Sequence, residues 1–150
     1  PILWFHLILC EIKWLQRLGQ DTQELIHLIR LIELSNYIIN KLDQVMSREK
    51  LFLNGDLKLQ DLADALNVSV HSLSQAINAG KNQKFNDYLN ELRVQEAQRL
   101  MASDSHQEMK LIAIALDSGF NNKTSFLNAF KKYTGHSPSE YREKLLAQAS

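Results

Sequence analysis

The sequence predicts an all-α fold, with two helix-turn-helix units joined by a long connecting helix and preceded by an N-terminal helical extension. Apolar residues recur at three- and four-residue steps over most of the chain, which is the period of an amphipathic helix. The first 50 residues show none of the strict apolar–polar alternation of a half-buried strand. Two prolines and five glycines among 150 residues also argue against an all-β or disordered chain.

The composition limits the classes of function without selecting one. Seventeen basic and seventeen acidic residues give a formal net charge of zero, whereas a nucleic-acid-binding domain usually carries a basic excess. Any basic surface must therefore be concentrated on one face. The single cysteine, Cys10, excludes an internal disulfide and fits a reducing cytoplasm. The histidines are scattered, and no HExxH, CxxC, GxSxG or glycine-rich nucleotide loop occurs. We expect no enzyme, no metal and no cofactor.

Residues 1–50 form the expected extension, and its first segment has two interpretations. Residues 1–10 are nearly all apolar, but a helix needs about 20 residues to span a bilayer. A set of aromatic and basic residues that would suit a membrane interface lies in and just after this segment: Trp4, Lys13, Trp14 and Arg17. One interpretation is the end of a transmembrane segment whose remainder lies upstream. The other, which we favour, is an amphipathic helix packed on its neighbour or on a partner chain.

The second half of the extension carries a heptad-like stripe. Gly19 to Thr22 should break the first helix, with Asp21 or Thr22 capping the next. No breaker follows until about Glu49. Along this stretch the following residues fall at alternating three- and four-residue steps: Leu25, Leu28, Ile32, Ser35, Ile39, Leu42 and Met46. The stripe serves either a homodimer formed through residues 21–49 or a long helix packed on the domain at 51–150.

The sequence predicts the first helix-turn-helix unit at residues 51–83. Its first helix, at 58–67, places Leu59, Leu62, Ala63 and Leu66 on one face. Ser69 should cap the second helix, which buries Leu73, Ala76 and Ile77. The outer face of that second helix is polar and uncharged: His71, Ser72, Ser74, Gln75 and Asn78. Such side chains can bond the edges of DNA bases, although exposed polar helix faces are common in proteins of every kind.

Residues 84–101 predict the connecting helix, followed by a polar loop at 102–108. Apolar residues recur in it at helical spacing: Phe85, Tyr88, Leu89, Leu92, Val94, Ala97 and Leu100.

Residues 110–145 predict the second unit. In its first helix Ile112, Ala115 and Leu116 form one apolar face. Ser118-Gly119 should end that helix, Phe120 should turn inward, and Asn122 or Thr124 should cap the next helix. In the second helix we expect Phe126, Leu127 and Phe130 inside, and Lys123, Thr124, Asn128, Lys131 and Lys132 outside. Gly135 ends it, and Ser137-Pro138 begins a last helix.

The residues of this second unit form a specific signature. An Ala-x-x-x-Gly-Phe turn at Ala115, Gly119 and Phe120 precedes Ser125-Phe126, Phe130-Lys131, Gly135 and the ending Ser137-Pro138-x-x-Tyr141-Arg142. With these residues the chain resembles the AraC/XylS family of bacterial transcription regulators. The run from Tyr88 to Ala97 in the connecting helix is similar as well. The resemblance covers residues 51–145, about two thirds of the chain.

The resemblance implies two helices that read DNA. The base-reading positions it implies are His71, Ser74 and Gln75 in the first unit and Lys123, Thr124 and Asn128 in the second. The phosphate candidates are Ser72, Ser125, Lys131 and Lys132, because such contacts set the register without reading sequence. Arg93 should join the two units through an ion pair or hydrogen bond. The implied partners are double-stranded DNA and RNA polymerase in a bacterial cytoplasm; the effector and the target promoter are not indicated.

The chain departs from the family at two positions. Family members usually carry a basic residue on the first reading helix, where this sequence has none, so we expect weaker base contacts there. They also usually have glycine in place of Asn82. Asparagine tolerates left-handed backbone angles better than other non-glycine residues, so the turn should still form.

These features support one leading hypothesis and two alternatives. Two reading helices held about one DNA turn (~34 Å) apart can enter successive major grooves, which favours a sequence-specific DNA-binding transcription regulator. A helical protein-interaction module with weak or lost DNA binding is one alternative, favoured by the uncharged first reading helix. A membrane-tethered regulator is the other, favoured by residues 1–18.

Overall fold

The computed structural model of the chain describes residues 2–103 and 109–149. For residues 2–18, 20 and 148–149 it describes the helical backbone without the side chains. The side chains expected at a membrane interface (Trp4, Lys13, Trp14 and Arg17) therefore lie outside the described residues, as do positions 104–108 of the predicted polar loop. Among the described residues, no helix is both long enough and apolar enough to cross a lipid bilayer.

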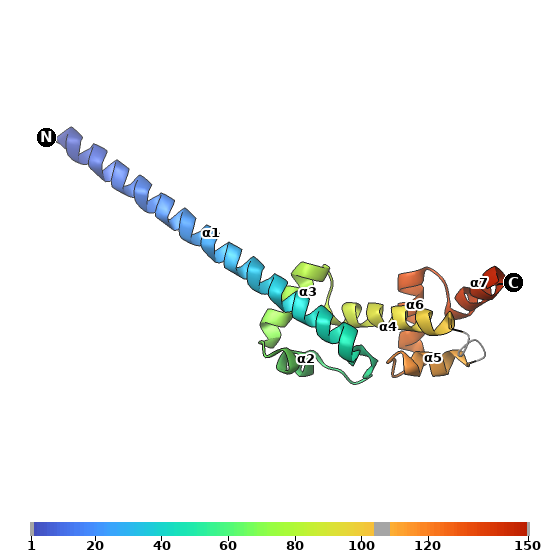
Figure 1. The fold of residues 1–150 in the computed structure, drawn as a ribbon. Helices are drawn as coiled ribbons and strands as arrows, with labels where there is room; N and C mark the ends of the chain where they lie inside the picture. The colour runs from blue at the N-terminus through green and yellow to red at the C-terminus, as the bar shows by residue number, and fades with distance from the viewer. Residues whose placement is uncertain (1, 104–108, 150) are drawn as a thin grey trace.

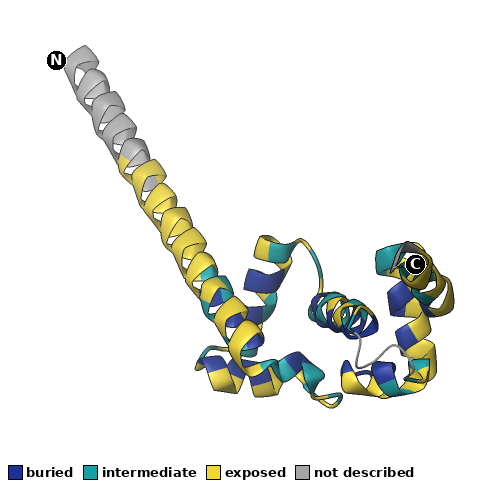
Figure 2. Ribbon diagram, turned by 45° about the vertical axis from the view of Figure 1, so that its right-hand side comes forward, coloured by how far each residue is buried: buried dark blue, intermediate teal, exposed yellow. Residues whose placement is uncertain are grey.

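The described residues form helices and no strand, which confirms the all-α prediction (Figure 1). In chain order they are α1 (Ile2–Glu49), the short 3-10 helix η1 (Leu51–Leu53), α2 (Leu59–Leu66), α3 (Val70–Lys81), α4 (Phe85–Met101), α5 (Leu111–Asp117), α6 (Lys123–Thr134) and α7 (Pro138–Ala149). Helix α4 lies between α2 and α3 on one side and α5 and α6 on the other, in both ribbon views (Figures 1 and 2).

The predicted break at Gly19 to Thr22 is wrong, because α1 is one helix through this segment. The Thr22 hydroxyl donates to the carbonyl oxygen of Gly19 inside the helix, at 3.2 Å, and does not cap a new one. A glycine inside a helix costs only about 1 kcal/mol relative to alanine. Without a proline to remove a backbone donor, that cost is too small to stop the helix.

The C-terminal end of α1 belongs to the core of the first unit. Ile38, Leu42 and Met46 are at most 3% exposed and pack with α2, α3 and the start of α4. Further toward the N-terminus the helix projects away from the domain, and Figure 2 shows its described part there as exposed. The stripe predicted from residues 25 to 46 is therefore divided between a covered half and an open half.

Helix α4 contributes to two separate cores. Its N-terminal residues Tyr88 and Leu89 join the core formed with α1, α2 and α3. Its C-terminal residues, including Val94, Ala97 and Leu100, join the core formed with α5, α6 and α7. One helix thus fixes the position of each unit relative to the other.

The predicted apolar faces of α5 and α6 need correction. Ile112 and Leu116 are 43% and 56% exposed, and Leu127 is 36% exposed. Ala115 in α5 and Phe126 and Phe130 in α6 are buried as predicted, and Ile114 and Ala129 are buried as well. The short helix α5 packs against α4 and α6. The side of α5 that contacts them includes Ile114, which the spacing had placed outside the apolar face, and leaves Ile112 and Leu116 exposed.

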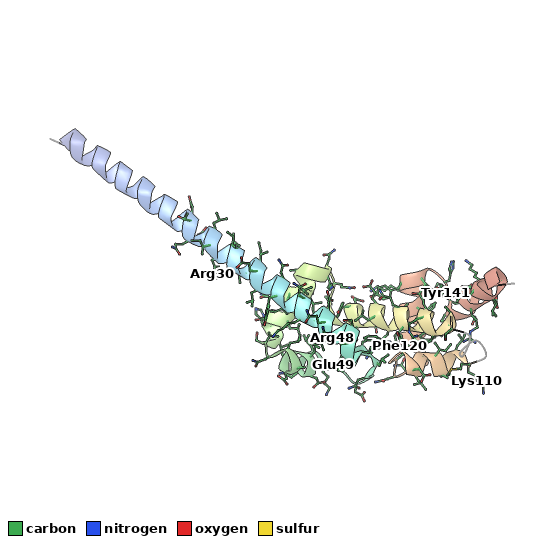
Figure 3. The ribbon with its side chains drawn as sticks, viewed as in Figure 1. Arg30, Arg48, Glu49, Lys110, Phe120 and Tyr141 are labelled. Carbon is green, nitrogen blue, oxygen red and sulfur yellow. The ribbon has the colours of Figure 1, made fainter. Side chains whose placement is uncertain are left out.

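A row of aromatic rings fills the second core. Phe120, Phe126, Phe130 and Tyr141 follow one another with ring centroids 5.3–5.5 Å apart, each pair edge-to-face. Figure 3 labels the two ends of the row, Phe120 and Tyr141. Edge-to-face pairs of this kind stabilise a core by about 0.5–1.5 kcal/mol each beyond the area they bury.

Replacing Leu42 by alanine should destabilise the first unit by about 2–5 kcal/mol, because the substitution leaves a cavity in a close-packed core. Urea unfolding followed by circular dichroism measures the loss. The matched control is Ile26→Ala in the open half of the same helix, where the side chain is 40% exposed and the expected change stays within about 0.5 kcal/mol. Equal effects of the two variants would contradict the placement of α1 in the core.

Candidate nucleic-acid interface

Helix α3 presents the first set of predicted base-reading side chains. Its N-cap is Ser69, whose hydroxyl oxygen accepts the backbone N–H of Ser72 at 3.0 Å, as predicted. His71 and Gln75 are exposed and Ser74 is half-buried. The Ser72 hydroxyl lies 2.8 Å from that of Ser69, so this phosphate candidate already takes part in the helix cap.

Helix α6 presents the second set. Its N-cap is Asn122, which accepts the backbone N–H of Ser125 at 2.8 Å. Lys123, Thr124 and Asn128 are all exposed along the outer side of the helix. They occupy its first two turns, the part of a recognition helix that contacts base edges in helix-turn-helix proteins.

The exposed side chains on both reading helices are available to a ligand. Within residues 2–103 and 109–149, no hydrogen bond or ion pair engages the side chains of His71, Gln75, Lys123, Thr124 or Asn128. The first set is uncharged and the second contains one lysine. Lys123 is therefore the one formally charged side chain among the predicted base-reading residues.

The two lysines predicted to contact phosphates differ in their surroundings. Lys131 is exposed. Lys132 forms an ion pair with Asp87, in the first turn of α4, and this bond raises the pKa of Lys132. Tyr133 adds a hydrogen bond to the carbonyl oxygen of Asp87 at 2.8 Å. Lys132 thus fastens α6 to α4, whereas no hydrogen bond or ion pair engages the Lys131 side chain among the described residues.

Arg93 is the buried residue that joins the two units. Its Nε donates to the carbonyl oxygen of Phe52 and its Nη2 to that of Asn54, each at 2.8 Å. Its guanidinium carbon lies 5.9 Å from the ring centroid of Phe120, in the second unit. Burial lowers the pKa of Arg93, and the nearby Asp56 partly opposes that shift. The bonds go to backbone carbonyls of the 51–55 segment, which also touches the second unit.

Two glycines allow that segment and the turn of the second unit to touch. A Cβ atom on Gly119, whose φ is +89°, would lie 2.4 Å from the carbonyl oxygen of Phe52. A Cβ on Gly55 would lie 1.6 Å from the side-chain oxygen of Asn121. The Asn121 amide in turn donates to Asp56 at 2.9 Å. We call this set of contacts between the 51–56 segment, Arg93 and the 119–121 turn the clamp.

An ion-pair network holds the end of α1 against α4. Lys50 donates to Glu96 at 3.1 Å, and Arg99 donates to the same carboxylate at 2.8 Å. The hydrogen bond from Arg99 is the main cause that lowers the pKa of Glu96. Lys50 has a positive φ of 48°, so the chain turns sharply where α1 ends and the clamp segment begins.

Two asparagines that the sequence interpretation overlooked line a hollow between the units. Asn86 and Asn90 of α4 join residues of the clamp and the N-terminus of α6 around a hollow of about 270 Å³. Their i, i+4 spacing places them on one face of α4, and this spacing was the signal available in the sequence.

The sequence matches a known family and curated bacterial proteins. A family model described as a helix-turn-helix domain matches residues 62–144, more than half of the chain. An uncharacterized HTH-type transcriptional regulator of Staphylococcus aureus (strain COL) is 28% identical over 103 residues, which are 69% of this chain and 13% of that protein. The Msm operon regulatory protein of Streptococcus mutans is 28% identical over 89 residues, 59% of this chain and 31% of that protein. The chain thus spans less than a third of either relative.

Solved structures give the same result. The C-terminal domain of AraT, a response regulator from Geobacillus stearothermophilus, is 31% identical with a TM-score of 0.57, over 76% of this chain and 84% of that one. The C-terminal domain of the two-component response regulator yesN from Fusobacterium nucleatum is 28% identical with a TM-score of 0.58, over 69% of this chain and 98% of that one.

Replacing Arg93 by methionine should separate the two units energetically. The change keeps much of the side-chain volume but leaves the carbonyl groups of Phe52, which is buried, and of Asn54 without their donor, a loss of about 2–4 kcal/mol in the free energy of unfolding. Thermal and urea unfolding provide the measurement. Arg99→Met, which removes an exposed arginine from the same helix, is the control and should lose much less. Equal losses of unfolding free energy in the two variants would show that the hydrogen bonds of Arg93 in the clamp stabilise the fold no more than an exposed arginine does.

Proposed function

The chain belongs to the AraC-type helix-turn-helix family, and on that premise we propose that it is the DNA-reading part of a bacterial transcription regulator. The observation that carries the proposal is the pair of capped helices α3 and α6, each with outward side chains that no other described residue engages. A scaffold of one helix, α4, positions both. A regulator of this class acts by binding DNA in the cytoplasm.

The mechanism follows from the rigid connection. Helices α3 and α6 enter two successive major grooves about one turn (~34 Å) apart, so one chain reads an asymmetric site. His71, Ser74 and Gln75 contact bases in one groove, and Lys123, Thr124 and Asn128 contact bases in the other. Gln75 and Asn128 suit adenine and Lys123 suits guanine. Phosphate contacts from Lys131, Ser125 and the helix N-termini set the register.

The hollow between the units extends this mechanism. Asn86 and Asn90 lie beside Asn122 and Ser125 of the second reading helix. Uncharged amides and hydroxyls are frequent phosphate ligands. We therefore add these two asparagines to the candidates for contact with the backbone that crosses between the two grooves.

Assembly and transcription activation belong to the same proposal. A homodimer formed through the arm at 21–49 would double the number of phosphate contacts, which matters for a chain of zero net charge. A contact with RNA polymerase would convert binding into activation. The part of the arm from Ile38 onward is covered by its own domain, so pairing would use the segment before it.

Selection from a randomised DNA library tests the reading function. We expect enrichment of a bipartite motif with its halves about 10–10.5 base pairs apart, and loss of that enrichment in the variant Gln75→Ala with Lys123→Ala, because each lost base contact should cost about 1–3 kcal/mol. The matched control is Gln95→Ala with Lys144→Ala, exposed residues on α4 and α7, which should keep the motif.

A chain that is folded but enriches no motif at low salt would overturn the direct-reader proposal. It would favour the alternative of a helical interaction module that has lost DNA binding.

The two neighbouring lysines of α6 provide a test of the phosphate contacts. Lys131→Ala should reduce the slope of log K against log salt by about 0.9, the value for one phosphate contact on B-DNA. Lys132→Ala should leave that slope unchanged, because its ammonium group is bound to Asp87. Fluorescence anisotropy with the selected DNA between 50 and 200 mM salt, roughly the range in which this dependence is steep, measures both. A larger change for Lys132→Ala would reverse the assignment.

A further inference from the structure

We propose that two copies of this chain pair in parallel along residues 25–35 of α1, with the helix of one copy lying in the groove between α1 and α3 of the other. The inference deepens the proposed regulator, since it names the partner of its arm, and its physical basis is independent of DNA.

The open half of α1 exposes an unusual amount of apolar surface. Eight large apolar side chains between residues 25 and 37 are 40–59% exposed: Leu25, Ile26, Leu28, Ile29, Leu31, Ile32, Leu34 and Tyr37. The largest apolar patch on a typical monomer is about 300–600 Å² and often functional. Six of the eight lie within about 120° of Leu28 around the helix, and Ile26 and Tyr37 lie on the opposite side. A standard interface needs roughly 800 Å² from each partner, to which the wall of the groove formed by α3 also contributes.

This apolar surface continues the face that the domain already covers. Ile38 and Leu42 are buried against α3, and one to three turns earlier Leu28, Leu31 and Ile32 point along the same side of the helix. These three residues form one wall of a groove of about 820 Å³, and Ala76 and Ala79 of α3 form the other. The groove is thus an unfilled extension of a helix-packing seam.

The residue pattern on this face matches a second copy of the same helix. In the heptad frame Leu25 and Ile32 occupy a positions and Leu28 a d position. Of these residues, Ile32 at a and Leu28 at d form the combination, β-branched at a and leucine at d, that favours a parallel two-stranded pair. Ser35 occupies the next d position. C-terminal to Ser35, this face of α1 packs against α3 of the same chain and not against a partner. Of the e and g positions that flank the seam, Ile29, Leu31 and Asn36 carry no charge and Glu24 is acidic. Glu24, at g, faces the partner's e position, which is Ile29, so pairing brings no like charges together.

A lipid surface fits this helix less well. Glu24, Arg30 and Glu33 interrupt the segment on several sides, and Figure 3 shows Arg30 on the open part of α1. An interfacial helix separates a charged face from an apolar face, whereas this segment is apolar on most of its circumference. Two copies bury more of that circumference than a flat surface does.

Pairing determines how two readers meet DNA. Because α1 runs without a break into the first core, parallel arms hold both reading domains at the same end of the dimer. A two-fold dimer binds sites that share its symmetry, so two bipartite sites should be inverted relative to one another. Because Gln75 lines the groove as well, the partner's helix lies beside the first reading helix and competes with DNA for this side chain.

Sedimentation velocity of the intact chain tests the pairing. We expect a concentration-dependent dimer for the unchanged sequence and at least a 100-fold weaker association for Leu28→Asp with Ile32→Asp. The matched control is Ile26→Asp with Tyr37→Asp. These residues are also exposed and apolar, but they lie roughly 160–180° around the helix from Leu28, so the dimer should survive. Thermal unfolding verifies that every variant is folded.

The orientation has a separate test. In a Cys10→Ser background, Leu25→Cys should form an interchain disulfide on mild oxidation, because equivalent positions meet only in a parallel pair. A monomer at all concentrations, a dimer indifferent to Leu28→Asp with Ile32→Asp, or no cross-link would each overturn the inference. So would flotation of a monomer with phosphatidylglycerol vesicles that the same double substitution abolishes. A dimer that enriches no DNA motif would support the pairing and reject the proposed DNA reader. A monomer that enriches a motif would support the DNA reader and reject the pairing.

Discussion

The burial of one guanidinium group between two apolar cores is the constraint on which the arrangement of this domain depends. The cores share only α4, and a single helix could leave the units free to tilt about it. Arg93 lies at the point along α4 where the two cores meet, and it binds the carbonyl groups of the 51–55 segment. A buried charge is tolerable only when its donors are satisfied, so Arg93 requires that segment in one conformation. The segment in turn presses on the turn that precedes α6, where Gly119 leaves no room for a side chain. The separation of the two reading helices is set by this chain of contacts.

The same logic explains how a chain without net charge can serve as a DNA reader. Several of its cations are bound internally: Lys50 and Arg99 to Glu96, Lys81 to Asp43, and Lys132 to Asp87. Each ion pair links two segments of the chain, or two turns of one helix, and its opposite charges largely cancel in the electrostatic field outside the protein. The cations left on the reading surface are few. Among the described residues Lys123 and Lys131 form no ion pair, and Lys131 lies next to Lys132 and within electrostatic range of Glu140. In the proposed reader, the amides and hydroxyls of α3 and α6 supply most of the base contacts, and the number of phosphate contacts from a single chain is small.

Local chemistry was predictable from the sequence, and long-range contacts were not. Ser69 and Asn122 cap their helices, and Asn82 adopts a left-handed angle of φ 52°, because each depends on neighbours within a few residues. The end of α5 just before Gly119 was predictable for the same reason. The contacts of Gly55, Asn121 and Phe52 with residues 41–67 positions away leave no periodic signal. The exposed faces of Ile112 and Leu127 were misassigned for a related reason, since spacing defines a stripe but the packing partner decides which side is covered.

The division of α1 into a covered and an open half has a mechanical consequence. Ile38, Leu42 and Met46 make the end of the arm part of the first core, and Lys50 and the clamp follow within a few residues. A rotation or displacement of the arm cannot be absorbed by a flexible joint, because close-packed interiors transmit strain. It must reach the contact between α1 and α3 first and the clamp next. The first reading helix lies against the arm itself, whereas the second is reached only through Arg93 and the 51–56 segment. A displacement of the arm therefore reaches the two units by different routes. Helix α3, whose predicted base-reading side chains carry no formal charge, is the one in direct contact with the arm.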